Sequence, residues 1–280
     1  MLDSVEVDSL EILVIVDNVT DSLSTNPPGV EAEWRGLLTR GRIRVLSGPN
    51  ICCAHHGLSL LLTARVGEST QTLLFDAGAE RQTFIRNAGI LGVDFGIITD
   101  IALSHGHWDH AGGMLAAIEQ VVKVRGVGKV NAYMHPGMFS QRGLRLPSGL
   151  VFPMENVPTE GELRNAGANV ICTDQPQVTG QGAFYISGEI PRVTSYEMGL
   201  AGQVRRVTEG AEWEPDPLVM DERYVSVNVK GRGQFIFSAC SHAGIINVLK
   251  HARDTLQQPA RPTGQPGRRR TGDERRQANL

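Results

Sequence analysis

Cysteine is scarce in this 280-residue sequence. Its four cysteines form neither a C-x-x-C pair nor the framework of a disulfide-rich secreted domain. Long apolar runs are also missing: none approaches the ~20 residues of a membrane-spanning helix, and the acidic start MLDSVEVDSL has no signal-peptide core. The net charge of −3 gives no overall attraction to nucleic acids or anionic membranes. We therefore expect a cytoplasmic protein with no nucleic-acid or membrane partner.

The hydrophobic content of 41% is sufficient for a sizeable core. β-Branched and apolar runs bounded by turn residues predict strands, and longer amphipathic segments predict helices. Residues 20–57 are expected to form a long loop, because their composition is mixed and interrupted by Pro and Gly turns. Hairpins mixed with strand–loop–helix units favour an α/β fold with mixed sheets. Strands are expected at 11–17, 58–66, 71–78, 100–104, 129–134, 168–173, 183–187, 224–230 and 234–239, and helices at 80–91, 111–124 and 243–256.

The composition changes after Leu256. Residues 257–280 are rich in Arg, Pro and Gln and lack aromatic residues, Val, Ile and Met. Such a segment buries too little apolar surface to offset the entropy of ordering. We therefore predict one folded domain at 1–256 and a disordered basic tail at 257–280.

The stretch LSHGHWDHAGGM holds three histidines and an aspartate within six residues. His105 and His107 are two residues apart, so on an extended backbone both imidazoles face the same side and can bind one metal ion. Asp109 and His110 follow at the turn and can serve a second ion about 3.5–4 Å away, the spacing of two-metal hydrolytic sites. A polar loop with incidental histidines is the less favoured interpretation.

This stretch, together with LLFDAG ahead of it, resembles the signature of the metallo-β-lactamase-fold hydrolases. HHGLSLLL, SGEIPR and SACSHAGIINVL further resemble the dihydropterin–ribofuranosylaminobenzene phosphate synthase-like branch of that superfamily. The similarity runs from about residue 10 to residue 255. It implies an αββα sandwich of two mixed β-sheets flanked by helices, with metals bound at one edge.

The resemblance also implies roles for individual residues. His105, His107, Asp109 and His110 would be metal ligands, with Asp109 and His110 also catalytic. Asp76 would support the site from behind the ligands. One or two Zn²⁺ ions are expected, although His and Asp donors also accept Mn²⁺ or Fe²⁺.

Cys240 lies where relatives place a bridging aspartate or a cysteine ligand, and His242 could share that role. A thiolate or imidazole at a strand end is a plausible ligand on chemical grounds. The alternatives are a cysteine that packs as a small apolar residue and a histidine that is a polar residue at a helix start.

Further residues are candidates for a second shell or for substrate contacts. Glu189 and Arg192 occupy a stretch where many relatives carry a metal-binding histidine, and Arg192 would suit a phosphate or carboxylate on the substrate, with a surface ion pair as the alternative. His56 and Asn18 are expected to line the pocket. His135 is expected to be a ligand or pocket residue, or else to cap a turn at a strand end.

The sequence departs from the family after the CSHAGI helix. Relatives continue with another strand and a further histidine ligand, whereas here the arginine-rich tail follows, so the C-terminal elements of the sandwich are expected to be missing. The favoured function is hydrolysis of a small, anionic ester or phosphoester by a metal-bound hydroxide. The alternatives are a transferase like the dihydropterin–ribofuranosylaminobenzene phosphate synthase and a degenerate, non-catalytic metal-binding protein.

Overall fold

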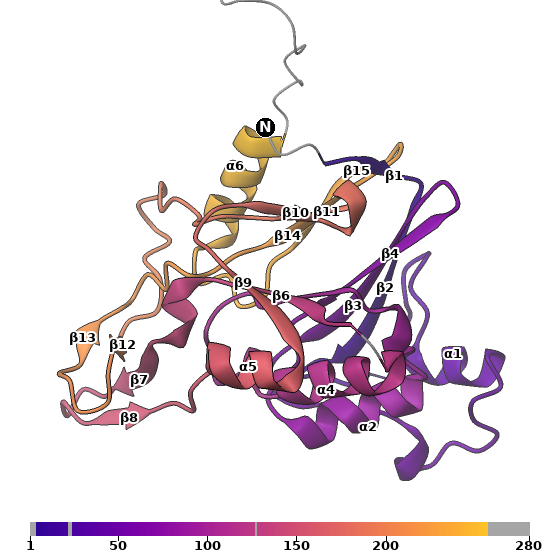
Figure 1. Ribbon diagram of the computed structural model, residues 1–280, viewed down its shortest axis with the longest axis horizontal. Coiled ribbons are helices and arrows are strands. Elements are labelled where there is room, and N and C mark those ends of the chain that lie inside the picture. Colours follow the sequence, from indigo (N-terminus) through magenta and orange to yellow (C-terminus); the bar gives the residue numbers. More distant parts are fainter. Residues whose placement is uncertain (1–3, 22–23, 127, 257–280) are drawn as a thin grey trace, which may run out of the picture.

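The computed structural model describes residues 4–21, 24–126 and 128–256. Two β-sheets lie face to face, and helices cover their outer surfaces (Figure 1). The layer order is therefore helices, six-stranded sheet, five-stranded sheet and helix, which confirms the predicted αββα arrangement of mixed sheets. The predicted disordered tail at 257–280 lies outside the described residues.

The six-stranded sheet has the order β2-β3-β4-β5-β6-β9. Its first three strands are antiparallel neighbours, whereas β4, β5, β6 and β9 are parallel. Apolar residues of α2, α4 and the sheet, such as Phe84, Ile118 and Leu74, form the core on its outer face. The bounds are β2 (Ser9–Val16), β3 (Ser59–Val66), β4 (Ser69–Phe75), β5 (Asp100–Ala102), β6 (Val130–Met134), β9 (Ala168–Cys172), α2 (Arg81–Leu91), α4 (Met114–Arg125) and α5 (Glu160–Ala166).

In the second sheet, β14 pairs with β15 on one side and with both β1 and β11 on the other. Strand β10 pairs with the outer side of β11. Leu62, Leu73 and Phe75 of the first sheet pack against Phe184 and Val227 of the second to form the inner core. Helix α6 covers the outer face. The bounds are β1 (Glu6–Val7), β10 (Gln177–Thr179), β11 (Phe184–Ile186), β14 (Val225–Val229), β15 (Gly233–Phe237) and α6 (Ile245–Leu256).

A third, four-stranded sheet was not expected from the sequence. Its order is β13-β12-β7-β8, and it lies beside the sandwich (Figure 1). The strands are β7 (Gln141–Arg145), β8 (Val151–Pro153), β12 (Gln203–Arg206) and β13 (Glu214–Pro215). All four are short, and β7 and β12 are rich in Arg and Gln, so the strands lack the apolar alternation that identifies a half-buried strand.

The other expected elements are present within a few residues of their predicted ends. The predicted loop at 20–57 was wrong in one respect, because it contains helix α1 (Glu33–Thr39). The remaining short helices are α3 (Trp108–Ala111) and the 3₁₀ turns η1 (Gly48–Asn50), η2 (Phe95–Ile97), η3 (Pro136–Phe139) and η4 (Gly180–Gly182).

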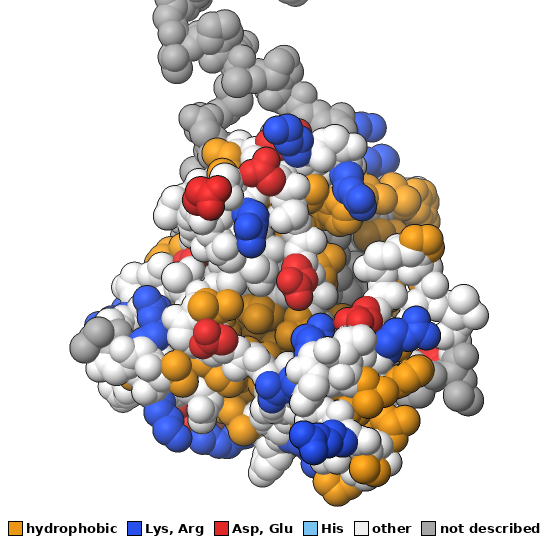
Figure 2. All heavy atoms as spheres, turned by 90° about the vertical axis from the view of Figure 1, so that its right-hand side faces the viewer, with side chains coloured by type: hydrophobic (Ala, Val, Ile, Leu, Met, Phe, Trp, Pro, Cys, Tyr) orange, Lys and Arg blue, Asp and Glu red, His pale blue; other side chains and the backbone are white. Residues whose placement is uncertain are grey.

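The surface that carries the edge strand β2 mixes apolar and charged side chains (Figure 2). Ile12 and Val14 of β2 remain about half exposed there. Among the described residues, no helix has both the length and the apolar character required to cross a bilayer.

Candidate metal centre

The histidine motif lies at the carboxyl edge of the parallel strands β4, β5 and β6. Asp76 follows β4, residues 104–110 follow β5, and His135 follows β6. Parallel neighbours end at the same edge of a sheet, so the three segments meet there. Gly112 allows the backbone after the motif to pack directly against the loop after β4, because a Cβ at this position would lie 1.9 Å from the carbonyl oxygen of Ala79.

Four imidazoles converge at this edge. His105 Nε2 lies 2.9 Å from His107 Nδ1, and the rings of His105 and His110 have centroids 4.5 Å apart. The ring of His242, which follows β15 of the second sheet, lies 4.7 Å from that of His105 and 4.8 Å from that of His107. Residues from both sheets of the sandwich therefore form one cluster.

Each histidine of the motif has an outer partner on the nitrogen that faces away from the cluster. Ser104 Oγ lies 2.9 Å from His105 Nδ1, Asp76 Oδ2 lies 2.7 Å from His110 Nδ1, and Gln203 Nε2 lies 3.0 Å from His107 Nε2. Such contacts fix ring orientation and direct the opposite nitrogen of each ring toward the other donor atoms of the cluster.

Cys240 joins two groups of donor atoms. One group consists of His105, Cys240 and His242, and the other of Asp109, His110 and Cys240; within each, the ligand atoms lie within 4.8 Å of one another. Cys240 Sγ is 3.1 Å from His110 Nε2. The thiol is exposed and faces the cluster, so the alternative of a packed apolar cysteine does not describe it.

Burial and neighbouring carboxylates give the four histidines of the cluster different pKa values. Burial lowers the pKa of His105 well below its ordinary value, that of His107 to about 3 and that of His242 to about 4. Burial disfavours the charged form of His110, but the Asp76 carboxylate, helped by Asp109, raises the pKa of His110 well above its ordinary value. Burial likewise disfavours ionised Asp109, but the hydrogen bond with His110 lowers the pKa of Asp109. Three neutral imidazoles and the ionised Asp109 therefore face one another, whereas His110 must lose a proton before it can bind an ion.

The donor set fits a divalent transition metal ion. His242 Nε2 is buried and has no hydrogen-bond partner among the described residues, which is costly unless a ligand satisfies it. Neutral imidazole, thiolate and carboxylate are the ligands of zinc sites. The residues of both donor groups, with His107, would hold the ion or ions.

Sequence reasoning missed two acidic residues that support the cluster. Asp221 Oδ2 accepts a hydrogen bond from the backbone N–H of Gly106, between the first two histidines, at 2.8 Å, and Asp221 pairs with the buried Arg142 of β7. Glu222 accepts a hydrogen bond from the N–H of His242 at 2.9 Å. The sequence MDER, directly ahead of an apolar strand, could have indicated them. Two adjacent acidic residues are seldom buried unless they have polar partners.

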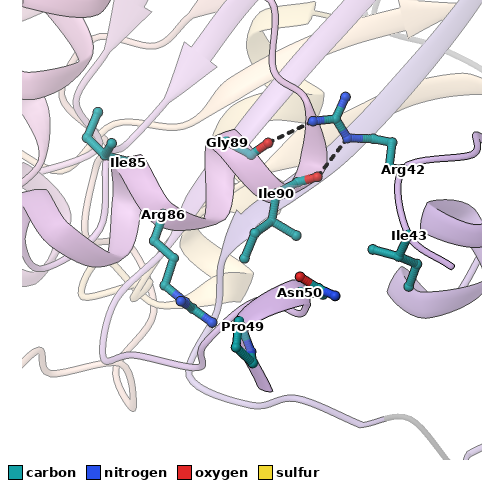
Figure 3. Close-up of a pocket in the computed structure, with 8 residues that line it drawn as sticks. All are labelled: Arg42, Ile43, Pro49, Asn50, Ile85, Arg86, Gly89 and Ile90. Carbon is teal, nitrogen blue, oxygen red and sulfur yellow. Dashed lines mark hydrogen bonds between the residues drawn. The ribbon is translucent and has the colours of Figure 1, made fainter. Parts of the chain in front are cut away.

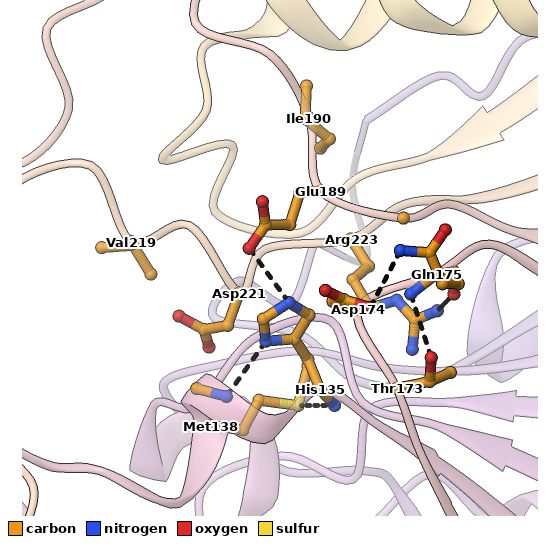
Figure 4. A network of polar contacts seen from close by, with 12 residues as sticks. His135, Met138, Thr173, Asp174, Gln175, Glu189, Ile190, Val219, Asp221 and Arg223 are labelled. Carbon is orange, nitrogen blue, oxygen red and sulfur yellow. Dashed lines mark hydrogen bonds and ion pairs between the residues drawn. The ribbon is translucent and has the colours of Figure 1, made fainter.

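His135 and Glu189 form a neighbouring pair (Figure 4). His135 Nε2 lies 3.4 Å from Glu189 Oε1, and His135 Nδ1 accepts a hydrogen bond from the N–H of Gly137 at 3.0 Å. His135 thus caps the turn after β6, which was one of its two predicted roles. The exposed Glu189 stands beside it.

His56 lies at the cluster, as predicted for a pocket residue. Its Nε2 is 3.6 Å from Asp109 Oδ2, and its ring stacks on that of Trp108. Asn18 is exposed at the end of β2, and among the contacts of the described residues none joins it to the cluster.

The guanidinium of Arg192 donates to the carbonyl oxygens of Ile190, Leu218 and Val219. It forms no ion pair with any of the described residues, so the predicted surface ion pair is not present there. Its contact with a phosphate or carboxylate of a substrate stays a prediction. Arg192 ties two loops together beside the site.

A separate cavity of about 460 Å³ lies between α2 and the loop before β3 (Figure 3). Arg42, which lines it, donates to the carbonyl oxygens of Gly89 and Ile90. The lining contains no histidine, cysteine or acidic residue. This cavity is therefore not part of the metal centre.

Comparison with known proteins shows which families and folds this chain is similar to. Residues 57–171 match the model of the metallo-beta-lactamase superfamily. The crystal structure of Tm1679, described as a metal-dependent hydrolase of the beta-lactamase superfamily, superimposes with a TM-score of 0.59 at 19% identity, covering 89% of this chain and 73% of that one.

Two curated proteins of Methanocaldococcus jannaschii are also similar. The 7,8-dihydropterin-6-methyl-4-(beta-D-ribofuranosyl)-aminobenzene-5'-phosphate synthase is 24% identical over 208 residues, covering 70% of this chain. The match spans 65% of the synthase's length. An uncharacterized protein is 28% identical over 204 residues, covering 71% of this chain and 68% of its own.

Proposed function

The chain has the metallo-β-lactamase fold, and we propose that it is a metal-dependent hydrolase of a small, anionic ester or phosphoester. The observation that carries the proposal is the convergence of four imidazoles, the Asp109 carboxylate and the Cys240 thiol at one edge of the sandwich. Zinc is the ion we propose, because nitrogen and sulfur donors suit it better than they suit magnesium or calcium.

The two donor groups that share Cys240 allow one or two ions. His105, His107 and His242 would hold one ion, and Asp109 and His110 a second, with Cys240 common to both. A divalent ion held by these residues would lower the pKa of water toward about 7 and would withdraw charge from the electrophilic atom of the substrate.

The chain's own residues would orient the reaction. Asp109, whose carboxylate lies 3.4 Å from His110 Nε2, would accept a hydrogen bond from the attacking water. The water oxygen forms a bond to carbon or phosphorus, the bond to the leaving oxygen breaks, and the proton of the water ends on that oxygen. The exposed His56, 3.6 Å from Asp109, offers a path by which protons exchange with solvent.

A second candidate function is a transferase reaction like that of the dihydropterin-derived phosphate synthase. The similarity to that relative over 208 residues favours it. Both candidate reactions require a bound metal ion, so the presence of metal does not distinguish them. The substrates that the protein converts do.

The test begins with elemental analysis of the purified full-length protein. We expect zinc in the wild type, a loss in His105→Gln and no loss in the control His55→Gln, because His55 lies outside both donor groups. Protein without metal would overturn the proposal.

Zinc-loaded protein is then assayed with aryl phosphodiesters and lactones and, separately, with a dihydropterin and a ribofuranosylaminobenzene phosphate. Hydrolysis that is lost in His105→Gln supports the hydrolase. Condensation without hydrolysis would favour the transferase, and bound metal without turnover of either kind would indicate a non-catalytic metal-binding protein.

A further inference from the structure

The cavity between α2 and the loop before β3 combines apolar walls with positive charge (Figure 3). Its volume of about 460 Å³ falls within the usual range of small-molecule sites, about 300–1,000 Å³. Ile43 of the loop and Ile85 and Ile90 of α2 supply the apolar surface. Two guanidiniums complete the lining, that of Arg42 from the loop and that of Arg86 from α2.

The guanidinium of Arg42 is fixed at the end of α2. Its Nε donates to the carbonyl oxygen of Ile90 and its Nη2 to that of Gly89, each at 2.8 Å (Figure 3). The charge also suits the carbonyl end of a helix. These contacts hold the guanidinium in place but provide no negative charge to pair with it.

The guanidinium of Arg86 is fixed in the same way, although it does not lie at a helix end. Its Nε donates to Cys53 Sγ at 3.1 Å, and its Nη2 donates to the carbonyl oxygens of Gly48 and Ile51 at 2.6 and 3.0 Å. These contacts tie the loop to α2, a task for which a neutral amide donor would suffice.

No carboxylate neutralises either charge. Among the described residues, neither Arg42 nor Arg86 forms an ion pair, and Nη1 of each makes no hydrogen bond. The carboxylate of Glu33 reaches the same loop, but it accepts from the backbone N–H of Cys52 at 2.6 Å. Two permanently charged groups with unused donors therefore line a cavity that contains no acidic side chain.

We propose that this cavity is a second binding site, separate from the metal centre, for a small organic anion with an apolar body. The guanidiniums of Arg42 and Arg86 bind its carboxylate, sulfonate or phosphate group, and its apolar part packs on the isoleucines. Both guanidiniums are already held in place, so binding does not have to pay for ordering them. This inference needs no metal ion and does not depend on the proposed reaction.

The test is calorimetric titration of the purified full-length protein with hexanesulfonate at low ionic strength. Sodium sulfate and hexanol provide the charged group and the apolar chain separately. We expect hexanesulfonate to bind at least about 10-fold more tightly than either. Equal binding of sulfate would indicate an adventitious ion only, and equal binding of hexanol would indicate unspecific apolar contact. Either result, or no binding of hexanesulfonate, would overturn the proposal.

The variants Arg42→Gln and Arg86→Gln test the source of the attraction. Each removes one charge, and we expect hexanesulfonate affinity to fall about 10-fold, as for the loss of one hydrogen bond to a charged group. The matched control is Arg81→Gln on the same helix, because Arg81 pairs with Glu119 at 2.7 Å and lies outside the lining. Its affinity should equal that of the wild type. Unchanged affinity in both cavity variants would overturn the proposal.

Gly89→Leu tests the site without altering either guanidinium. Gly89 lines the cavity four residues after Ile85 on the same face of α2, and a Cβ there meets no atom within 4 Å. The leucine side chain should fill the cavity and abolish hexanesulfonate binding, while the urea midpoint is maintained or raised. Wild-type affinity in this variant would overturn the proposal.

His105→Gln separates this site from the metal centre. Hexanesulfonate affinity should be the same in His105→Gln as in the wild type, because the cavity lining contains no residue of the histidine cluster. Loss of binding in His105→Gln would place the anion at the metal centre instead. That result would overturn the second site and leave the proposed hydrolase function as it stands.

Discussion

The substitution Asp76→Asn tests how the carboxylate behind the cluster prepares His110. Asp76 is fully buried, its Oδ1 accepts from the backbone N–H of Ser104 at 2.7 Å, and its Oδ2 lies 2.7 Å from His110 Nδ1. A carboxylate accepts at both oxygens, whereas an amide accepts at one end and donates at the other. The backbone N–H cannot change, so the asparagine oxygen stays with Ser104 and the amide nitrogen faces His110.

Without metal, His110 can still form a hydrogen bond with the asparagine of the variant. His110 accepts at Nδ1 and carries its proton on Nε2, so the free energy of unfolding should fall by only about 1 kcal/mol, as a charged hydrogen bond becomes a neutral one. Metal binding needs Nε2, the nitrogen 3.1 Å from Cys240 Sγ. The proton must then return to Nδ1 and face the amide N–H, and one buried unsatisfied donor costs about 1–3 kcal/mol. Loss of the Asp76 charge also makes it easier for His110 to lose the proton that zinc displaces, which offsets part of this cost. Zinc affinity should therefore fall by about 5-fold, the lower end of what 1–3 kcal/mol allows.

Two measurements check this prediction: zinc competition with a fluorescent chelator, and urea unfolding of the chelated protein. The control is Asp100→Asn, because Asp100 is also buried but its oxygens accept from Thr99 and Asn131, away from the rings. Its zinc affinity should be that of the wild type. Equal zinc affinity in Asp76→Asn and wild type, or an equal loss in both variants, would refute the reasoning.

Three further predictions follow from the same contacts. Gly106→Ala should lower the free energy of unfolding by about 1–3 kcal/mol and weaken zinc binding, because its Cβ would lie 2.6 Å from the carbonyl oxygen of Met138. The control is Gly89→Ala in helix α2, where a Cβ meets open space, and this variant should raise the urea midpoint. Cys240→Ser should reduce bound zinc per chain by elemental analysis, because both donor groups lose their shared sulfur; unchanged content would exclude Cys240 as a ligand. The chelated protein should lose stability as the pH falls below 6.5, because His242 (pKa about 4), His105 and His107 stay neutral in the folded protein, whereas the same histidines take up protons in the unfolded chain. The urea midpoint should therefore depend less steeply on pH in His242→Gln, and an unchanged slope would contradict this.

The sequence predicted the parts of the site that are contiguous or that end strands. Residues 105–110 are adjacent in the chain, so their spacing alone indicated shared ligation. Asp76, Cys240 and His242 follow apolar strands whose pattern is clear, and strand ends of a sandwich meet at its edge. Local pattern and tertiary position agree at these places.

The supporting residues could not be predicted in this way. Gln203 is 96 residues from His107 and lies on a strand, QVRR, that has no apolar alternation. Arg142 looks like a surface residue in the sequence, yet it is 2% exposed. Both residues are buried because of the third sheet, in which β7 pairs with β12 about 60 residues further along the chain. The periodicity of a single sequence does not reveal such long-range pairing.

The buried pair of Arg142 and Asp221 joins that third sheet to the histidine turn, so it yields a last prediction. Asp221 holds the N–H of Gly106, and Arg142 pairs with Asp221 and lies 3.5 Å from Asp216. Arg142→Met should lower the free energy of unfolding by about 3–5 kcal/mol, because it leaves buried acids without their cation. Asp221→Asn should also be destabilising, since it leaves the buried guanidinium with Asp216, at 3.5 Å, as its remaining acidic partner. The double variant removes both charges while the asparagine oxygen still accepts from Gly106, so its loss should be smaller than the sum of the single losses by at least about 1 kcal/mol. Urea unfolding of the four proteins measures this coupling, and strictly additive losses would show that the pair does not act as a unit.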